Sequence, residues 1–140
     1  MTKNPVISNL REYYKARGFR VVGIRQSEDK IDITLRDKRT NSCTCPNCNK
    51  EVTYSALSRP RTYKERPSED NRSVFLHVYR REMHCYHCKK HFTAPHEIFP
   101  GRFATKDFEN LVRFFKTTPN LTYKEIAEDF GVSEHYVRSI

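Results

Sequence analysis

Two CxxC pairs, Cys45–Cys48 and Cys85–Cys88, constrain the fold of this chain more than any other feature. Two residues between cysteines let both thiolates face one metal ion from a tight turn, so two such turns supply four sulfur ligands. Four thiolates leave no open coordination position for water, which favours a structural zinc over a catalytic one. We therefore predict a single structural zinc ion held by Cys45, Cys48, Cys85 and Cys88.

The composition gives a reason for a metal. Leu, Ile, Val and Phe make up 31 of the 140 residues, which is close to the level at which chains stop folding unaided. A structural zinc contributes about 10–16 kcal/mol of apparent binding free energy, so it would compensate for a small apolar core. A redox role for one CxxC pair is the rival interpretation, but it normally needs a βαβ setting that the pattern lacks.

The sequence alone does not decide whether other residues also bind the metal. Cys43 is a fifth cysteine, which is either a spare thiol or an alternative ligand in a shifted register. Three histidines near the second CxxC pair are also close enough in sequence to compete for the metal. They are His84, His87 and His91.

The rest of the pattern predicts an α+β chain. Asn9–Arg17 has the spacing of a short helix, with Ser8 as its N-cap and Gly18 at its end. Apolar and polar residues alternate on either side of residues 27–30, which predicts a β-hairpin. The same alternation over Ser73–Met83 predicts a strand that leads into the second CxxC pair.

The segments between these elements look less regular. Tyr54–Arg72 is polar and broken by two prolines, so we predict an irregular excursion with a short strand at Tyr54–Leu57. Pro95 and Pro100 mark a linker. We therefore divide the chain into an N-terminal helix and hairpin at 1–41, a zinc ribbon at 42–100 and a helical unit at 101–140.

Residues 122–140 have the spacing of a helix-turn-helix. Thr122 and Glu125 form a capping box, Gly131 suits the sharp turn, and Ser133 caps the second helix. The helical spacing of Lys106–Lys116 predicts a preceding helix that completes the core. A helical hairpin used only for packing is the alternative. In the DNA-binding interpretation, the residues offered to a major groove are Ser133, Glu134, His135, Tyr136, Arg138 and Ser139.

The charge distribution favours a polyanionic partner, double-stranded DNA. The net charge is +9, yet residues 105–140 hold 5 basic and 6 acidic residues, against 11 and 6 in residues 41–104. Phosphate attraction must therefore come mainly from outside the helical unit. The best phosphate-contact candidates are Arg59, Arg61, Lys64, Arg66, Arg80, Arg81, Lys89, Lys90 and Arg102.

The combination of motifs resembles the N-terminal region of the ISL-three group of bacterial insertion-sequence transposases. The resemblance covers roughly residues 19–140 and rests on the order of CPxC, the basic excursion, a strand ending in two arginines, a second CxxC followed by Phe92, and the IAEDFGVS segment. It implies a zinc ribbon ligated by the four cysteines and a base-reading helix from Glu134. It also implies recognition of the terminal inverted repeats of the mobile element, in the bacterial cytoplasm at the nucleoid.

Members of that family continue into a large catalytic domain with metal-binding acidic residues, for which this sequence has no counterpart. We therefore expect binding and no enzymatic activity from this chain. The chain ends at Ile140, inside the expected recognition helix, so we expect either a fragment of a longer protein or a short helix. No apolar stretch has the length of a membrane helix, so no membrane partner is expected.

Three alternatives stay open on the sequence alone. A free-standing zinc-dependent transcriptional regulator or repressor is the first, and it would be expected to dimerise. A ribbon that binds only protein is the second, and its binding would be insensitive to salt. An enzyme is the third, but no Ser/His/Asp set, glycine-rich phosphate loop or carboxylate cluster supports it.

Overall fold

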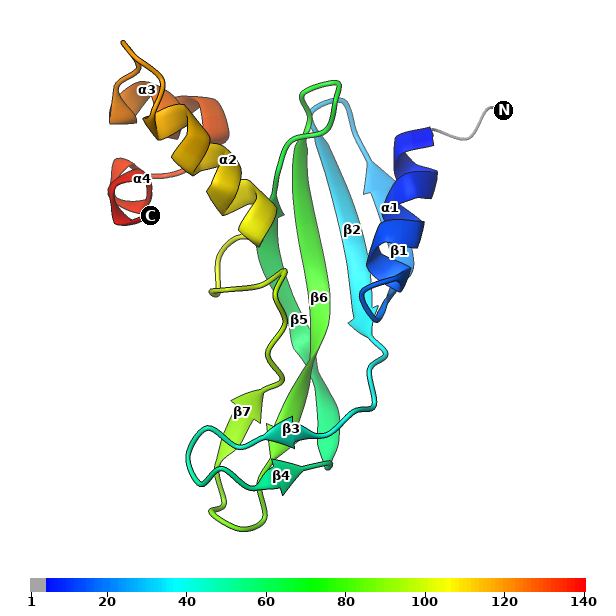
Figure 1. The fold of residues 1–140 in the computed structure, drawn as a ribbon. Coiled ribbons are helices and arrows are strands. Elements are labelled where there is room, and N and C mark those ends of the chain that lie inside the picture. Colours follow the sequence, from blue (N-terminus) through cyan, green and yellow to red (C-terminus); the bar gives the residue numbers. More distant parts are fainter. Residues whose placement is uncertain (1–4) are drawn as a thin grey trace.

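Alternating apolar side chains build a sheet whose longest strand runs through most of the length of the molecule (Figure 1). The computed structural model describes residues 5–140. The helices are α1 (Pro5–Lys15), α2 (Lys106–Lys116), α3 (Tyr123–Phe130) and α4 (Glu134–Ser139). The strands are β1 (Phe19–Gln26), β2 (Lys30–Asp37), β3 (Cys43–Thr44), β4 (Glu51–Val52), β5 (Ser55–Glu65), β6 (Ser73–His84) and β7 (His91–Thr93). The predicted α+β class is confirmed.

The main sheet has the strand order β1-β2-β6-β5, and β7 pairs with the last residues of β6. β2 and β6 run parallel, whereas the other neighbouring pairs are antiparallel. β3 and β4 form a separate two-stranded ribbon. Because β2 pairs with β6, the sheet continues across the boundary that we drew after residue 41.

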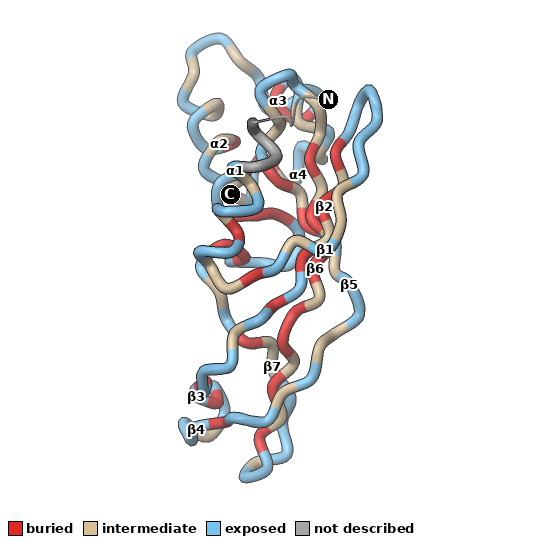
Figure 2. Tube along the Cα trace, turned by 90° about the vertical axis from the view of Figure 1, so that its right-hand side faces the viewer, coloured by how far each residue is buried: buried red, intermediate tan, exposed pale blue. Residues whose placement is uncertain are grey.

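One face of the sheet is buried and the other is open. Ile33, Leu76 and Val78 are fully buried on the covered face, where they pack with Tyr14 of α1 and with Phe99. The side chains between them on β2 and β6 are only half-buried, which produces the alternation along these strands in Figure 2. This alternation is the period expected of a sheet with one solvated face.

The apolar core is divided into three clusters. The first lies between the sheet and α1, the second surrounds the cysteines, and the third joins α2, α3 and α4. In Figure 1 the cysteine region occupies the lower end of the molecule and the three helices lie beside the upper part of β5. No cluster is large, so the cysteine region and the helical unit each depend on a small set of buried side chains.

Three local predictions need correction. α1 begins at Pro5 rather than at Asn9, so Ser8 lies inside the helix and is not its N-cap. The predicted irregular excursion instead contains β5, an 11-residue strand. The strand tolerates Pro60 because its register with β6 shifts between Leu57 and Pro60, which places the proline at a bulge. The predicted linker packs on the sheet, since Ile98 and Phe99 between its two prolines are each 5% exposed.

Candidate functional site

The two CxxC turns repeat each other in backbone geometry. In the first, Cys45 N–H donates to the Lys50 carbonyl over 2.9 Å and Asn49 N–H donates to the Cys45 carbonyl over 2.9 Å. In the second, Cys85 and Lys89 make the equivalent bonds, over 2.9 and 2.8 Å. Asn49 and Lys89 also share a left-handed φ, of 62° and 63°. Each turn therefore directs its two thiols in the same way.

The four sulfur atoms lie close enough to share one metal ion. All lie within 4.8 Å of one another, with 3.6 Å separating Cys45 from Cys88 and Cys48 from Cys85. A tetrahedron with metal–sulfur bonds of about 2.3 Å places its sulfur atoms roughly 3.8 Å apart. Disulfides need sulfur atoms about 2.05 Å apart, and all five cysteines are free. The arrangement therefore fits a single four-thiolate metal centre.

Two of these thiols have pKa values shifted in opposite directions from the ordinary 9.0. A hydrogen bond with the Asn47 side chain lowers the pKa of Cys88 to about 6. The backbone N–H of Lys50 lowers the pKa of Cys48, but desolvation and the other three sulfur atoms outweigh it and raise this pKa to about 11. Thiols bind a metal as thiolates, so metal binding would displace the proton of a thiol such as Cys48.

The other candidate ligands lie outside this group. Among the described residues, the potential metal-binding set consists of the four cysteines. Cys43 is buried in the same apolar cluster and pairs with Val52 in the small ribbon. His84 and His91 contact each other, with ring nitrogens 3.2 Å apart, and His87 is exposed. Val52, Met83 and Ala94 complete the apolar surroundings of the cysteines.

At the other end of the molecule, N-cap hydrogen bonds fix where α3 and α4 begin. The hydroxyl of Thr122 accepts from the Glu125 N–H over 3.1 Å, and that of Ser133 accepts from the Tyr136 N–H over 3.0 Å, as predicted. Gly131 has a φ of 66°, and its neighbour Val132 donates its N–H to the Ala127 carbonyl over 2.9 Å. This left-handed closure ends α3 and turns the chain into α4.

A shared core fixes α4 on the other two helices. Ile126 and Val137 are buried with Phe108 and Val112 of α2, and small Ala127 is 5% exposed where α3 meets its neighbours. The exposed side of α4 carries Glu134 and Arg138, which approach to 3.6 Å. His135 and Ser139 are also exposed. This helix therefore presents a polar face on the side opposite its packed core.

Tyr136 departs from the sequence prediction. Its ring packs against Phe103, with centroids 4.9 Å apart, and faces Phe108 at 6.1 Å. Its hydroxyl is buried without a hydrogen-bond partner among the described residues, and burial raises its pKa to about 12. Tyr136 was expected on the exposed face, but it belongs to the core of the helical unit.

Arg80 and Arg81 also need correction, because they are only 4% and 3% exposed. The Arg80 guanidinium donates to the Tyr63 hydroxyl and to the Ala94 carbonyl, while Arg81 donates to the Asn41 carbonyl. Both side chains hold the junction between the sheet and the cysteine region. Neither presents its charge to a phosphate in this structure.

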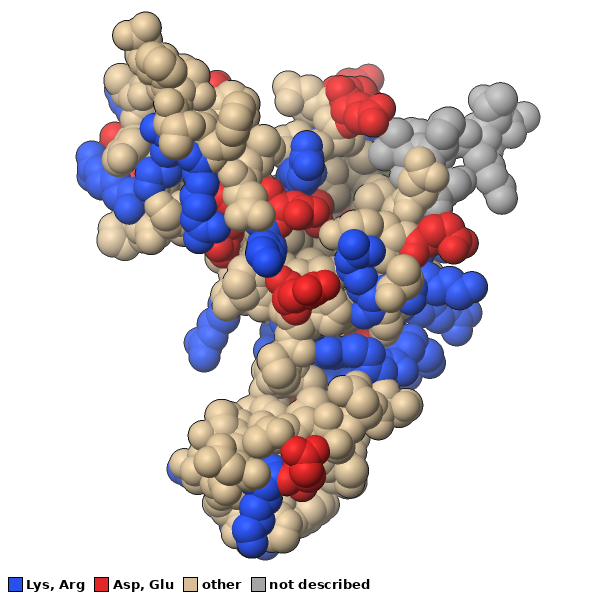
Figure 3. Space-filling model, viewed as in Figure 1, with Lys and Arg blue, Asp and Glu red and all other residues tan. Residues whose placement is uncertain are grey.

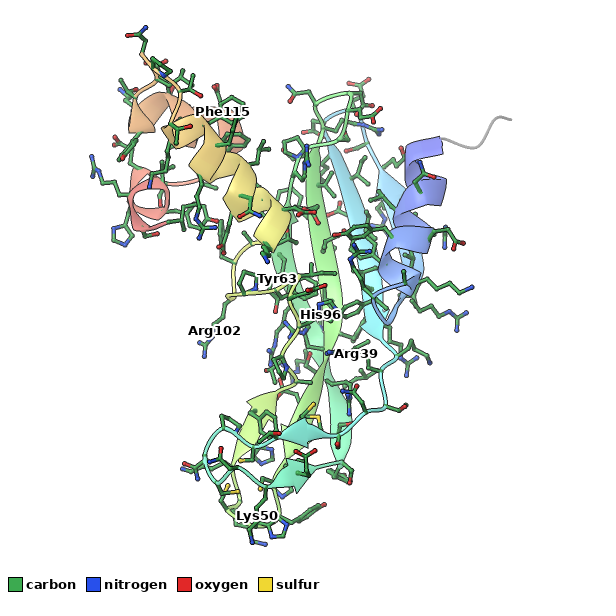
Figure 4. All side chains as sticks on the ribbon, viewed as in Figure 1. Arg39, Lys50, Tyr63, His96, Arg102 and Phe115 are labelled. Atoms are coloured by element: carbon green, nitrogen blue, oxygen red, sulfur yellow. The ribbon has the colours of Figure 1, made fainter. Side chains whose placement is uncertain are left out.

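The other predicted phosphate contacts fall into two groups. Arg61 pairs with Glu82, and Lys64 donates to the Gly131 carbonyl over 3.4 Å, so both have internal roles. Arg102 points away from the molecule in Figure 4, below the start of α2. The exposed members are Arg59, Arg66, Lys89, Lys90 and Arg102.

The sequence interpretation missed a buried carboxylate that joins three elements. Glu65 accepts from the Tyr14 hydroxyl of α1 over 3.1 Å and from the Thr105 hydroxyl, at the start of α2, over 2.6 Å. Burial raises the pKa of Glu65 in spite of these bonds. Because Tyr14 and Thr105 lie 51 and 40 residues away along the chain, local spacing carries no signal for this cluster.

Comparison of the chain with protein-family models, curated proteins and solved structures gave no match. None of the described helices has the length and apolar character needed to span a membrane.

Proposed function

We propose that this protein binds double-stranded DNA sequence-specifically through α4, with a structural zinc ion at the four cysteines. The observation that carries the proposal is the α3–Gly131–α4 geometry, in which a capped helix with an exposed polar face packs on two others through a shared core. Helix-turn-helix proteins use the second helix of such a pair to read the major groove.

The residues proposed to read bases are those that α4 leaves exposed. The side chain of Arg138 is 64% exposed and that of Glu134 is 44% exposed. Their ion pair is on the surface and therefore weak, so contacts to bases can replace it. An arginine reads guanine by bidentate hydrogen bonds, which is the commonest specific contact in the major groove. His135 and Ser139 supply further donors and acceptors beside it.

Zinc is the metal that we assign to the cysteine site. A closed set of four thiolates in two CxxC turns is the usual ligand set of structural zinc. It supplies no position for a bound water, so the metal would stabilise the fold and take no part in chemistry. The exposed Lys89 and Lys90 in the second turn then contact DNA phosphates without reading sequence.

The motif order also leads us to propose a biological setting, namely the site-recognition part of an insertion-sequence transposase. In this setting the target would be a terminal inverted repeat of the element. The support for this step is the resemblance of the motifs to the ISL-three group, together with the CxxC and α3–α4 geometry. We propose a binding role for the chain, without catalysis.

Selection from a pool of randomised duplexes tests the proposal. The zinc-loaded protein should enrich one sequence motif, and the His135→Ala/Arg138→Ala variant should enrich a degenerate one. The double variant changes only exposed side chains, so it serves as a folded control. A pool that stays random after several rounds with the wild-type protein would overturn sequence-specific binding.

A further inference from the structure

A charged groove lies at the edge of the sheet, between α1 and β1. Its volume is about 500 Å³, and its uncharged lining residues are Gly18, Phe19 and Val21. Figure 3 shows basic side chains gathered on this side of the molecule, at the lower end of α1. The charged residues that line the groove are Arg11, Glu12, Lys15, Arg20 and Lys38.

The positive charge in this groove is largely uncompensated. Four basic side chains meet one carboxylate, and within residues 9–140 no ion pair joins Lys15, Arg20 or Lys38 to an acid. The adjacent Arg39 is different, since its guanidinium binds Asp37 over 2.8 Å. A cluster of cations without internal partners attracts an anion from solution.

The strand register places a further arginine, which lies outside the groove lining, beside Arg20. Arg20 on β1 lies directly opposite Arg36 on β2 in the antiparallel pair, and both side chains are exposed. Like charges at directly opposite positions destabilise a sheet. An anion bound beside Arg20 would also relieve part of that repulsion, which adds to the charge argument at this edge of the sheet.

The groove borders an open edge of the sheet. β1 is the terminal strand in the sheet order, so its outer side has no neighbouring strand in the described part of the chain. Arginine and lysine side chains together with backbone N–H groups make most contacts to DNA phosphates. The Arg11 guanidinium is held over this edge by a 3.5 Å contact with the Val21 carbonyl.

We propose that this α1–β1 groove binds the phosphate backbone of the same DNA duplex that α4 reads. This inference rests on the proposed function. α2 and α3 are attached to β5 at the opposite edge of the sheet, through the Thr105–Lys64 and Lys64–Gly131 bonds. Three strand spacings of about 4.8 Å separate the two edges, or roughly 14 Å. α4 lies further out than β5 in Figure 1, so the duplex must span more than this width, and one turn of B-DNA is already about 34 Å long.

The test compares two variants that each remove two exposed lysines. Lys15→Gln/Lys38→Gln neutralises the groove, whereas Lys30→Gln/Lys106→Gln removes the same charge from the hairpin turn and from the start of α2. None of the four side chains is buried, so both variants should fold, which circular dichroism checks. The readout is the affinity for a fluorescent mixed-sequence duplex of about 40 base pairs at several salt concentrations.

The groove variant should bind with a salt slope smaller in magnitude by about 2, because each lost phosphate contact removes about 0.9. The control variant should keep the wild-type slope. Equal slopes in the two variants, whether both reduced or both unchanged, would overturn the groove assignment and leave the proposed function intact. Failure of the wild-type protein to bind any duplex would instead overturn the proposed function.

Discussion

The ammonium group of Lys64 lies 3.4 Å from the carbonyl oxygen of Gly131, so a strand of the sheet donates a hydrogen bond to the end of α3. A cation at this position also interacts favourably with the C-terminal end of the helix dipole. Lys64 was predicted from the sequence as a phosphate contact. The structure gives it a positioning role, because it fixes the turn that leads into α4.

The left-handed turn at Gly131 makes a stability prediction. Gly131→Ala should lower the free energy of unfolding by about 1–2 kcal/mol, because a Cβ is strained at a φ of 66°. The added Cβ would also lie 2.9 Å from the Lys64 ammonium nitrogen. Urea unfolding measures this change.

Gly101→Ala is the matched control, because no atom lies within 4 Å of the Cβ it would add. This variant should have nearly wild-type stability. Equal destabilisation by the two substitutions would show that Gly131 has no special role in the turn.

The buried carboxylate of Glu65 predicts a pH dependence. Burial raises the folded-state pKa of Glu65 above the ordinary 4.5. Between the unfolded and folded pKa values, the folded state therefore binds more protons than the unfolded state. The contribution of Glu65 to stability is then present in full below pH 4.5 and is lost as the pH rises through the folded pKa.

Glu65→Gln removes this titration and keeps an oxygen that can accept from Thr105. The stability of the wild type minus that of the variant should therefore fall as the pH rises from about 4.5 to 7. Urea unfolding of both proteins over a pH series measures the difference, and effects of pH on the metal site cancel in it. A difference that does not change with pH would show that Glu65 titrates normally.

The two classes of cysteine should differ in their effect on metal content. Cys85→Ser removes one of the four clustered sulfur ligands, so the variant should lose zinc and the structure of the cysteine region. Cys43→Ser changes a buried cysteine outside that cluster, so it should keep one zinc ion per chain with a modest loss of stability. Elemental analysis of the purified proteins measures this. Loss of zinc from Cys43→Ser would mean that the ligand set is different.

Substitutions of base-reading residues and of phosphate-contacting residues should have different effects on DNA binding. Arg138→Ala should cost about 1–3 kcal/mol at particular base pairs of the selected site. Arg59→Ala should weaken binding to all sequences and reduce the salt slope by about 1. Competition with single-base variants of the site distinguishes these effects. If both substitutions act equally on all sequences, α4 does not read bases.

Much of the architecture could be predicted because its signals are local. The CxxC spacing predicted the cluster of four sulfur atoms, and Thr122 and Ser133 marked the starts of α3 and α4 correctly. The bounds of α2 also agree with the predicted helix. Each CxxC pair and each helix cap depends on residues only a few positions apart, although the two CxxC pairs meet across 37 and 43 positions of the chain.

The features that the sequence did not reveal depend on tertiary contacts. Arg80 looked like a surface charge, yet it is buried because Tyr63 and the Ala94 carbonyl accept its hydrogen bonds. β5 looked irregular, because its order comes from pairing with β6 and from the bulge at Pro60. The burial of Tyr136 similarly depends on Phe103, which lies 33 positions earlier in the chain.

The most direct test of the account is native mass spectrometry of the purified protein with a pool of short DNA duplexes at low salt. One experiment then reports both the metal content and the retention of DNA. We predict one zinc ion per chain and a complex of the zinc-loaded protein with duplex. A folded protein without zinc, or a zinc-loaded protein that retains no duplex, would contradict the account.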